Sequence, residues 1–379
     1  MTLLDLGVVG SSAKENEQRL PLHPEHLPDL DADLRERITL EHGYGERFGV
    51  SDADLAPHVA GFATRAEILA GSAVVLLPKP QHRDVEALSP GQVLWGWPHC
   101  VQDSELTQLA IDRELTLIAF EAMNHWTRDG HPGLHVFHKN NELAGYCSVL
   151  HALQLIGSTG DYGRRLTAAV IGFGATARGA VTALSAQGIH DVAVLTTRGV
   201  AAVASPIHSV RIVHLDHDPD GGPGHAITSR GRMELAPFLA ERDIVVNCTL
   251  QDPAAPLIYL RGPDLDAFRP GSLIVDVSCD EGMGFDWARP TTFEDPMVEV
   301  GDRIHYYAVD HTPSYLWNSA TWDISEAVIP FLRPVLEGAD AWEMDETLSR
   351  AIEIQDGHVR NPAILDFQNR SEEYPYAVT

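Results

Sequence analysis

The sequence predicts an α/β protein of two parallel-sheet domains, with the second domain inserted into the first and a cleft between them. Two series of short apolar runs alternate with helical stretches, one over the first 130 residues and one after residue 165. Strands and helices that alternate at this spacing are typical of parallel sheets. The chain length of 379 residues also suits two domains or more.

Five strands are expected in the first series. They are Leu6–Gly10, Arg37–Gly43, Ala73–Pro78, Gln92–Pro98 and Thr116–Glu121. Asp52–Ala60 and Ser104–Glu114 lie between these strands and have helical character. Trp126–Phe137 contains Asp-Gly and Pro-Gly pairs and predicts a loop. Asn141–Gly157 then predicts an amphipathic helix that ends at its glycine.

The second series predicts five more strands. They are Thr167–Gly174, Asp191–Arg198, Asp243–Thr249, Gly271–Ser278 and His305–Asp310. Ala175–Gly188 predicts a helix, and the Asp-, Gly- and Pro-rich stretch His214–Arg232 predicts a flexible insertion. A long helix at Ser319–Leu336 is expected to return the chain to the first domain, and the polar tail after Pro362 to drape over the surface. The domains are therefore expected at residues 1–140, 141–310 and 311–379, the last completing the first.

The composition excludes several classes of protein. Lys and Arg number 27 against 54 Asp and Glu, so the net charge of −27 leaves no large basic field for nucleic acid. No apolar run reaches membrane-spanning length, and the N-terminus MTLLDLGVVG reads as a strand because it lacks the basic start of a signal peptide. The four cysteines are far apart, which argues for a reducing, cytoplasmic compartment and against a zinc or disulfide scaffold.

A dinucleotide fingerprint begins the second series. Gly172, Gly174 and Ala177 form the pattern GxGxxA between a predicted strand and a predicted helix, with Ala175 and Thr176 inside it. Such glycines let the backbone approach a pyrophosphate, and the helix N-terminus offers unpaired N–H groups to it. The sequence therefore predicts two Rossmann-like domains, with the dinucleotide-binding domain inserted into the substrate domain.

The end of the second strand of that domain favours NADP(H), although NAD(H) remains possible. NAD sites usually carry an acidic residue there, and this chain has Thr197 and Arg198 instead. The Arg198 guanidinium would pair with a 2′-phosphate. The alternative is that Arg198 is a solvated loop residue.

Three polar side chains follow three strands of the first domain. Arg19 follows the first strand, Lys79 lies between two prolines after another, and His99 follows a third. The carboxyl ends of parallel strands meet at one edge, where ligands bind. There, Arg and Lys would hold a carboxylate and polarise a carbonyl, and His would transfer protons. Lys79 is one of only three lysines against 24 arginines, which suggests a need that Arg cannot meet.

Two other groups of residues have types that occur in metal or catalytic sites. His131, His135 and His138 have spacing that suggests a metal, but they lie in a Gly/Pro-rich loop without a carboxylate or Cys at ligand spacing, so no metal is expected. Cys100 next to His99 suggests a nucleophile, but the surrounding pattern offers no context for acyl transfer.

From about residue 7 to residue 338 the sequence resembles the alanine dehydrogenase and nicotinamide-nucleotide transhydrogenase superfamily. The motifs that carry this resemblance are KENEQRLPL (14–22), LLPKP (76–80), WPHC (97–100), IAFE (118–121), NELAG (141–145), VIGFGATARGA (170–180), VDVSCDEG (275–282), ARPTTFEDP (288–296) and YAVDHTPS (307–314). Within that group it is most similar to the N5-(carboxyethyl)ornithine synthase-like branch. The pair of His99-Cys100 and Glu121 also resembles saccharopine dehydrogenases.

The resemblance implies roles for individual residues. Arg19 and Lys79 would bind the substrate, with Glu121 beside them, and His99 would act as general acid and base. Asp280 would lie next to the nicotinamide. Residues 249–254 and 310–314 would line the cofactor, the residues concerned being Thr249, Leu250, Asp310, His311 and Pro313. The missing acidic ribose ligand and the Cys-Val-Gln after His99 depart from plain alanine dehydrogenases.

These observations predict an NADP-preferring oxidoreductase that acts on a CH–NH group, as opine-type dehydrogenases do. An amino acid and a 2-oxo acid such as pyruvate would condense to an imine, which is then reduced. The alternative enzyme is an alanine dehydrogenase-type reductive aminase that uses ammonia, and the non-enzymatic alternative is a nucleotide-sensing module. A homo-oligomer without nucleic-acid or membrane partners is expected.

Overall fold

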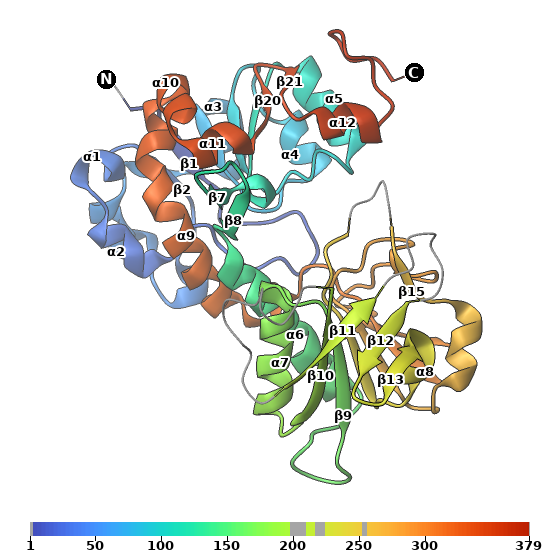
Figure 1. Ribbon diagram of the computed structural model, residues 1–379. Helices are drawn as coiled ribbons and strands as arrows, with labels where there is room; N and C mark the ends of the chain where they lie inside the picture. The colour runs from blue at the N-terminus through green and yellow to red at the C-terminus, as the bar shows by residue number, and fades with distance from the viewer. Residues whose placement is uncertain (1–2, 198–209, 217–223, 252–255, 379) are drawn as a thin grey trace. The chain divides into compact units, whose positions relative to one another are not determined.

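The computed structural model describes residues 3–197, 210–216, 224–251 and 256–378. The chain divides into two compact units, which are considered one at a time (Figure 1). Unit 1 comprises Met1–His138 and Trp317–Thr379, and unit 2 comprises Lys139–Leu316. Within the described ranges, no helix is long and apolar enough to cross a membrane.

Unit 1 contains an eight-stranded sheet in the order β21-β20-β6-β5-β4-β1-β2-β3. Its strands are β1 Leu6–Val8, β2 Ile38–Glu41, β3 Gly61–Ala63, β4 Val74–Leu76, β5 Val93–Gly96, β6 Thr116–Ala119, β20 Ile352–Gln355 and β21 His358–Val359. Strands β1 to β6 are parallel, and β20 pairs with β6 in the antiparallel sense. The parallel strands have the Rossmann order, which reverses between β1 and β4.

Helices cover both faces of this sheet. The helices of unit 1 are α1 Ala32–Arg35, α2 Asp52–Leu55, α3 Arg65–Gly71, α4 His82–Glu86, α5 Ser104–Asp112, α9 Trp317–Glu337, α10 Ala339–Met344, α11 Glu346–Ala351 and α12 Pro362–Phe367. Side chains alternate along β4, so Val74 and Leu76 join the core under α9 while Val75 joins the core under α5. In α9, Ile324 and Val328 are fully buried at a spacing of four, as the helical period requires.

Unit 2 contains a nine-stranded sheet in the order β13-β12-β11-β10-β9-β14-β16-β19-β18. Its strands are β9 Thr167–Ile171, β10 Asp191–Thr196, β11 Arg211–Asp216, β12 His225–Thr228, β13 Gly231–Glu234, β14 Ile244–Asn247, β16 Leu273–Asp276, β18 Met297–Val300 and β19 Ile304–Tyr307. The six strands from β11 to β19 are parallel and have the same Rossmann order as those of unit 1. The α/β prediction of two Rossmann-like sheets is thus confirmed.

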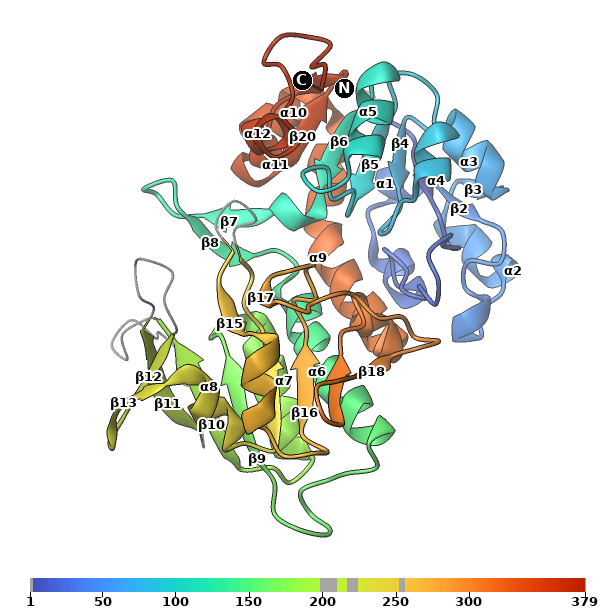
Figure 2. The ribbon, with the colours of Figure 1, turned by 90° about the vertical axis from the view of Figure 1, so that its right-hand side faces the viewer.

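The helices of unit 2 are α6 His138–Leu155, α7 Ala175–Ala186 and α8 Leu235–Ala240. Helices α6 and α7 lie side by side (Figure 2) and approach closely at two glycines. A Cβ atom on Gly179 would lie 1.7 Å from the carbonyl oxygen of Glu142, and one on Gly145 would lie 1.9 Å from that of Thr176. No larger residue fits at either position without moving a backbone.

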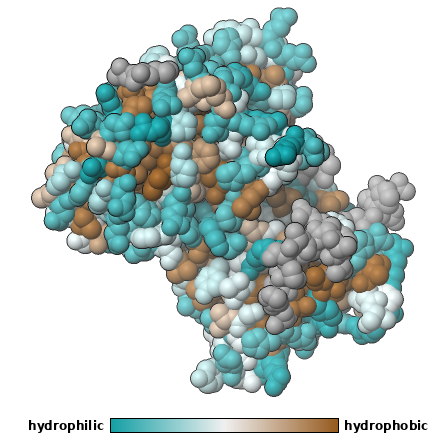
Figure 3. Space-filling view, turned by 60° about the vertical axis from the view of Figure 1, so that its left-hand side comes forward, coloured by the Kyte–Doolittle hydropathy of each residue, from teal (hydrophilic) through white to brown (hydrophobic). Residues whose placement is uncertain are grey.

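The remaining elements are short. Two small sheets are formed by β7 Asn124–Trp126 with β8 Pro132–His135, and by β15 Ile258–Leu260 with β17 Gly284–Phe285. Short 3-10 helices lie at η1 Pro24–Asp29, η2 Glu46–Phe48, η3 Ala56–His58, η4 Phe120–Ala122, η6 Gly262–Ala267 and η7 Thr312–Leu316. On the face seen in Figure 3, hydrophobic residues form separate areas among hydrophilic ones.

Three predicted segments differ from the structure. The predicted loop Trp126–Phe137 is largely the β7–β8 hairpin, because Gly130, with φ of 76°, lets the chain reverse and the two arms pair. The predicted insertion His214–Arg232 contains the end of β11 and most of the β12–β13 hairpin, and its residues 217–223 lie outside the described ranges. The tail after Pro362 forms α12 and then buries three of its side chains.

Candidate active site

The carboxyl edge of the unit 1 sheet collects the residues that the sequence singled out there. Arg19 lies on the segment after β1, Lys79 follows β4, His99 follows β5, and Glu121 lies in η4 directly after β6. The strand order reverses between β1 and β4, and such reversal points are where open α/β sheets bind ligands.

Trp97 is the side chain around which the two cations gather. The Arg19 guanidinium carbon lies 5.4 Å from the centre of the indole ring, and the Lys79 Nζ lies 5.6 Å from it. Both distances are within the range of a cation–π contact. Trp97 is only 7% exposed and packs edge-on against Phe120, with ring centres 4.9 Å apart. A buried, immobile indole therefore fixes two positive charges at one place.

Lys79 and His99 contact each other directly. The Lys79 Nζ lies 2.8 Å from the His99 Nε2. A charged ammonium only donates, so this contact requires a His99 Nε2 that carries no proton. His99 has a φ of 51°, a left-handed conformation that is strained for a residue with a side chain.

Glu121 supports the His99 backbone. Its Oε1 accepts a hydrogen bond from the His99 N–H at 2.7 Å, and its Oε2 is buried without a hydrogen-bond partner among the described residues. Burial, together with the negative charge of the nearby Glu353, raises the pKa of Glu121 to about 7, although Lys79 lowers it in part. Glu121 was predicted to bind substrate, and the contact that it makes here is with the loop that carries His99.

Glu17 is a member of the site that the sequence reasoning missed. Its Oε1 accepts from the Arg19 Nε at 2.8 Å and from the Arg19 backbone N–H at 3.0 Å, and its Oε2 pairs with Nη2. The two side chains are 1% and 2% exposed. Removing one partner of such a buried pair typically costs about 3–5 kcal/mol. The Glu-x-Arg spacing was the available indication.

In unit 2 the predicted dinucleotide fingerprint lies between β9 and α7. Gly172 has φ of 112°, and a Cβ there would lie 3.0 Å from the carbonyl oxygen of Cys248, so only glycine suits this turn. Gly174 is the N-cap of α7, and a Cβ built on it meets nothing within 4 Å. Ala175, Thr176 and Ala177 form the first turn of the helix. The open N-terminus of a 12-residue helix fits the pyrophosphate of NAD(P).

Asp276 organises the neighbouring strand ends and was not predicted. Its Oδ1 accepts from the Asn247 side chain at 2.9 Å and from the Cys279 N–H at 3.1 Å, and its Oδ2 accepts from the Tyr306 hydroxyl at 2.8 Å. Burial raises the pKa of Asp276 to about 6. The carboxylate thus fixes the backbone immediately before the predicted residue Asp280, whose own pKa is raised by burial.

The other predicted cofactor residues lie on loops of unit 2. Thr249 donates to the Asn247 Oδ1 at 2.7 Å, whereas Leu250 is 93% exposed. Asp310 is paired with His311, and His311 and Pro313 are buried. Thr197 is exposed at the end of β10, and Arg198 lies outside the described residues.

The structure does not support a metal site at the three histidines or a nucleophilic role for Cys100. Among the described residues, no group of three or more His, Cys, Asp or Glu side chains could hold a metal ion. His135 instead contacts the carbonyl oxygen of Glu121 through its Nε2 at 3.2 Å. Burial raises the pKa of the Cys100 thiol well above its ordinary value, so this thiol is a poor nucleophile.

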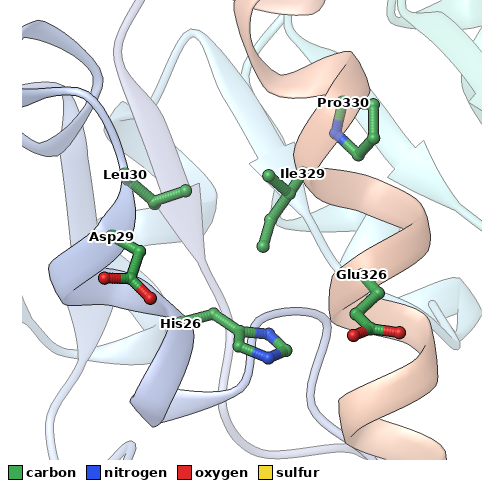
Figure 4. Close-up of a pocket in the computed structure, with 6 residues that line it drawn as sticks. All are labelled: His26, Asp29, Leu30, Glu326, Ile329 and Pro330. Carbon is green, nitrogen blue, oxygen red and sulfur yellow. The ribbon is translucent and has the colours of Figure 1, made fainter.

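A surface pocket of about 270 Å³ lies elsewhere in unit 1, between η1 and α9 (Figure 4). Its lining residues are His26, Asp29, Leu30, Glu326, Ile329 and Pro330. It includes none of the residues around Trp97, so it is separate from the candidate site.

Comparisons with known proteins agree with this architecture. The family model for the alanine dehydrogenase/PNT N-terminal domain matches residues 8–143, and the model for the C-terminal domain matches residues 165–362. A solved L-alanine dehydrogenase covers 96% of this chain and 99% of its own at 19% identity, with a TM-score of 0.75. A transhydrogenase from Sinorhizobium meliloti covers 93% and 99%, also at 19% identity, with a TM-score of 0.70.

Two curated relatives have similar coverage at low identity. The alanine dehydrogenase of Mycolicibacterium smegmatis is 24% identical over 94% of this chain and 95% of its own length. The N(5)-(carboxyethyl)ornithine synthase of Clostridium botulinum is 25% identical over 82% and 89%. With both family models matched over most of its length, the chain belongs to the alanine dehydrogenase/PNT family of NAD(P)-dependent oxidoreductases.

Proposed function

We propose that this protein is an NADP-preferring oxidoreductase that reduces an imine formed between a 2-oxo acid and the amino group of an amino acid. The overall reaction consumes the amine, the oxo acid, NADPH and one proton, and it yields a secondary amine, NADP⁺ and water. One observation carries the proposal: Arg19 and Lys79 both lie over the Trp97 ring at the edge of the unit 1 sheet, and His99 contacts Lys79 there.

Arg19 and Lys79 would hold the 2-oxo acid. A planar guanidinium, oriented by Glu17, suits the carboxylate, and a compact ammonium suits the adjacent carbonyl oxygen. The indole contacts both cations and supports their orientation. Arg19 would therefore bind the carboxylate of the 2-oxo acid, and Lys79 would polarise its carbonyl group.

His99 would manage the protons of imine formation. Attack of the amine on the carbonyl gives a carbinolamine, which loses water only when its hydroxyl is protonated. The unprotonated Nε2 beside Lys79 would take the proton that the amine loses on attack and pass it to the former carbonyl oxygen. The one further proton that the overall reaction consumes would then let this oxygen leave as water.

Unit 2 would bind the cofactor. The Gly172 turn and the Gly174 N-cap suit a pyrophosphate, and Thr197 with Arg198 would hold a 2′-phosphate. When bound, NADPH supplies the hydride that reduces the imine. Asp280, next to the backbone that Asp276 fixes, would lie beside the nicotinamide.

The choice between an amino acid and ammonia as the amine rests on the relatives and motifs. The N(5)-(carboxyethyl)ornithine synthase relative and the resemblance of the motifs to that branch favour an amino acid. The alternative is reductive amination with ammonia, which the alanine dehydrogenase relatives favour.

A matrix of amines and 2-oxo acids, followed by NADPH absorbance and product mass, tests the proposal. We expect turnover with pyruvate or a similar oxo acid only when an amino acid is present, and a product mass equal to both substrates minus one oxygen. Turnover that requires ammonia alone would replace it with the alternative. No turnover with any pair, despite NADPH binding, would favour a sensing module.

A further inference from the structure

We propose that the segment 363–378 is a positioning element for His99, acting through Gln368 and Arg370. The inference rests on the proposed function only in taking His99 as the acid and base. Both family models end before this segment, the second at residue 362.

Gln368 contacts the turn that follows His99. Its Nε2 donates to the carbonyl oxygen of Cys100 at 2.7 Å and lies 3.2 Å from that of Val101. The side chain is buried, with the residue 8% exposed. The Thr107 hydroxyl, on α5, also donates to the Cys100 carbonyl at 2.8 Å. The carbonyl one residue after His99 is thus held from two sides.

Arg370 fixes the orientation of the Gln368 amide. Its Nε donates to the Gln368 Oε1 at 2.6 Å, and a guanidinium has no acceptor, so the oxygen of the amide must face Arg370. The Nε2 donors therefore face the two carbonyls. Arg370 also donates to the Gln108 side chain at 2.7 Å and to the Ser104 carbonyl at 3.1 Å, both on α5. This network ties the segment to α5 and to the turn together.

The turn needs such support. His99 is held at φ of 51°, and its carbonyl accepts from the N–H groups of Gln102 and Asp103 at 3.1 and 3.0 Å. A non-glycine residue in this region persists only when its surroundings over-determine it. Glu121 holds the N–H of His99 at one end of the turn, and Gln368 holds the next carbonyl at the other.

A segment that only covered surface would need no such network. Gln368 and Arg370 carry buried polar groups that each cost free energy unless hydrogen-bonded. Both direct those groups at one short turn and the helix after it, while their neighbour Glu372 is exposed. The segment therefore stabilises one conformation of the turn after His99, and does more than cover the surface.

The test replaces Gln368 in the full-length protein. Gln368→Glu keeps the shape but removes both donors, and Gln368→Met keeps the length without either polar atom. Glu372→Gln, in the same segment, is the matched control. Ring nitrogen resonances of His99 are followed by NMR in protein labelled with ¹⁵N-histidine, and His99→Ala identifies them by their loss. Thermal unfolding and NADPH affinity are measured on each variant.

We expect Gln368→Glu and Gln368→Met to shift the His99 resonances and to leave the NADPH dissociation constant within twofold of wild type. With the substrates of the proposed reaction, kcat should fall about tenfold while KM changes less. Glu372→Gln should match wild type throughout. Unshifted resonances in a folded Gln368 variant would overturn the inference, as would unfolding of both variants, since the segment would then serve stability alone.

The NMR result is independent of the reaction. If His99→Ala retains full activity, the role of His99 in the proposed function fails, whatever the resonances show. If His99→Ala is inactive and the Gln368 variants are normal in spectrum and rate, the inference fails alone.

Discussion

The Nζ of Lys79 lies 2.8 Å from the Nε2 of His99, so each of these groups depends on the protonation state of the other. An ammonium at that distance donates to an unprotonated imidazole and repels an imidazolium. The pair can hold one mobile proton between two strand ends. A substitution can therefore test whether residue 79 must be a lysine.

Lys79→Arg should lose most of the activity even though it conserves the charge. Arginine is longer and planar, and it does not readily give up its proton, so it cannot share one with His99. Steady-state rates on purified protein that still binds NADPH provide the measurement. Activity within about threefold of wild type, a difference of only ~0.6 kcal/mol in activation free energy, would show that Lys79 is a solvated residue without a role in the chemistry.

His99→Ala should reduce turnover by about 10²–10⁴, the usual contribution of a general acid and base. NADPH affinity should not change, because His99 belongs to unit 1 and the dinucleotide fingerprint to unit 2. Fluorescence titration with NADPH and saturating kinetics separate the two effects. Weakened NADPH binding with unchanged turnover at saturation would place His99 outside the chemistry.

NADP(H) should be preferred over NAD(H), and Arg198→Ala should reduce that preference. A charge-assisted contact with the 2′-phosphate is worth roughly 1.5–3 kcal/mol, which is about tenfold to a hundredfold in affinity. The ratio of kcat/KM for the two cofactors checks this in both proteins. Equal values in the unmodified enzyme would contradict it.

Asp276→Asn should remove one component of the pH dependence of stability. Burial raises the pKa of Asp276 from 3.8 to about 6 in the folded protein, so between these values the folded state binds more protons than the unfolded state. The protonated Asp276 therefore contributes roughly 3 kcal/mol to the free energy of unfolding. This contribution is complete below about pH 4 and is lost as the pH rises through about 6.

Denaturant unfolding from pH 4 to pH 7 measures this change. The difference in free energy of unfolding between wild type and Asp276→Asn should shift toward the variant as the pH rises. The asparagine can still accept from Asn247 and Cys279 and donate to Tyr306, so the variant should fold. A difference that is constant with pH would show that Asp276 is ionised throughout.

Gly179→Ala should destabilise unit 2 by about 3 kcal/mol or more, the upper range for overpacking. Its Cβ would lie 1.7 Å from the carbonyl oxygen of Glu142, so α6 and α7 would have to separate. Gly71→Ala is the control, because that helical glycine has open space around its Cβ and should gain about 0.5–1 kcal/mol. Equal unfolding midpoints for the two variants would argue against a tight helix contact.

Hydrophobic runs predicted most of the parallel strands of the two large sheets, because buried parallel strands have few polar residues. β4 and β5, for example, lie within the expected segments Ala73–Pro78 and Gln92–Pro98. β20 was missed because its strand Ile352–Gln355 pairs with β6, more than 230 residues away in sequence, and only that pairing defines it. The β7–β8 hairpin was missed because its exposed residues carry no apolar pattern.

Arg19, Lys79 and His99 could be selected from the sequence because each follows a predicted parallel strand. The carboxyl ends of such strands meet at one edge of the sheet, and these three residue types suit acid–base chemistry there. Glu17 was indicated only by its spacing of two residues from Arg19, and Asp276 and Gln368 could not be found from the sequence. Asp276 and Gln368 each act by holding a residue whose identity no local sequence pattern indicates. The contact of Gln368 with Cys100 joins residues 268 positions apart.

The shared strand order of the two units has a consequence for how this protein can diversify. Each unit has one reversal point. In the proposed function, the first would hold its ligand with cationic side chains on loops, and the second with the backbone of a glycine turn. Side chains on loops change by single substitutions, whereas a backbone cradle changes only with the fold. On this proposal, new substrates would arise through single substitutions at a few loop positions of unit 1, while the backbone cradle of unit 2 stays unchanged.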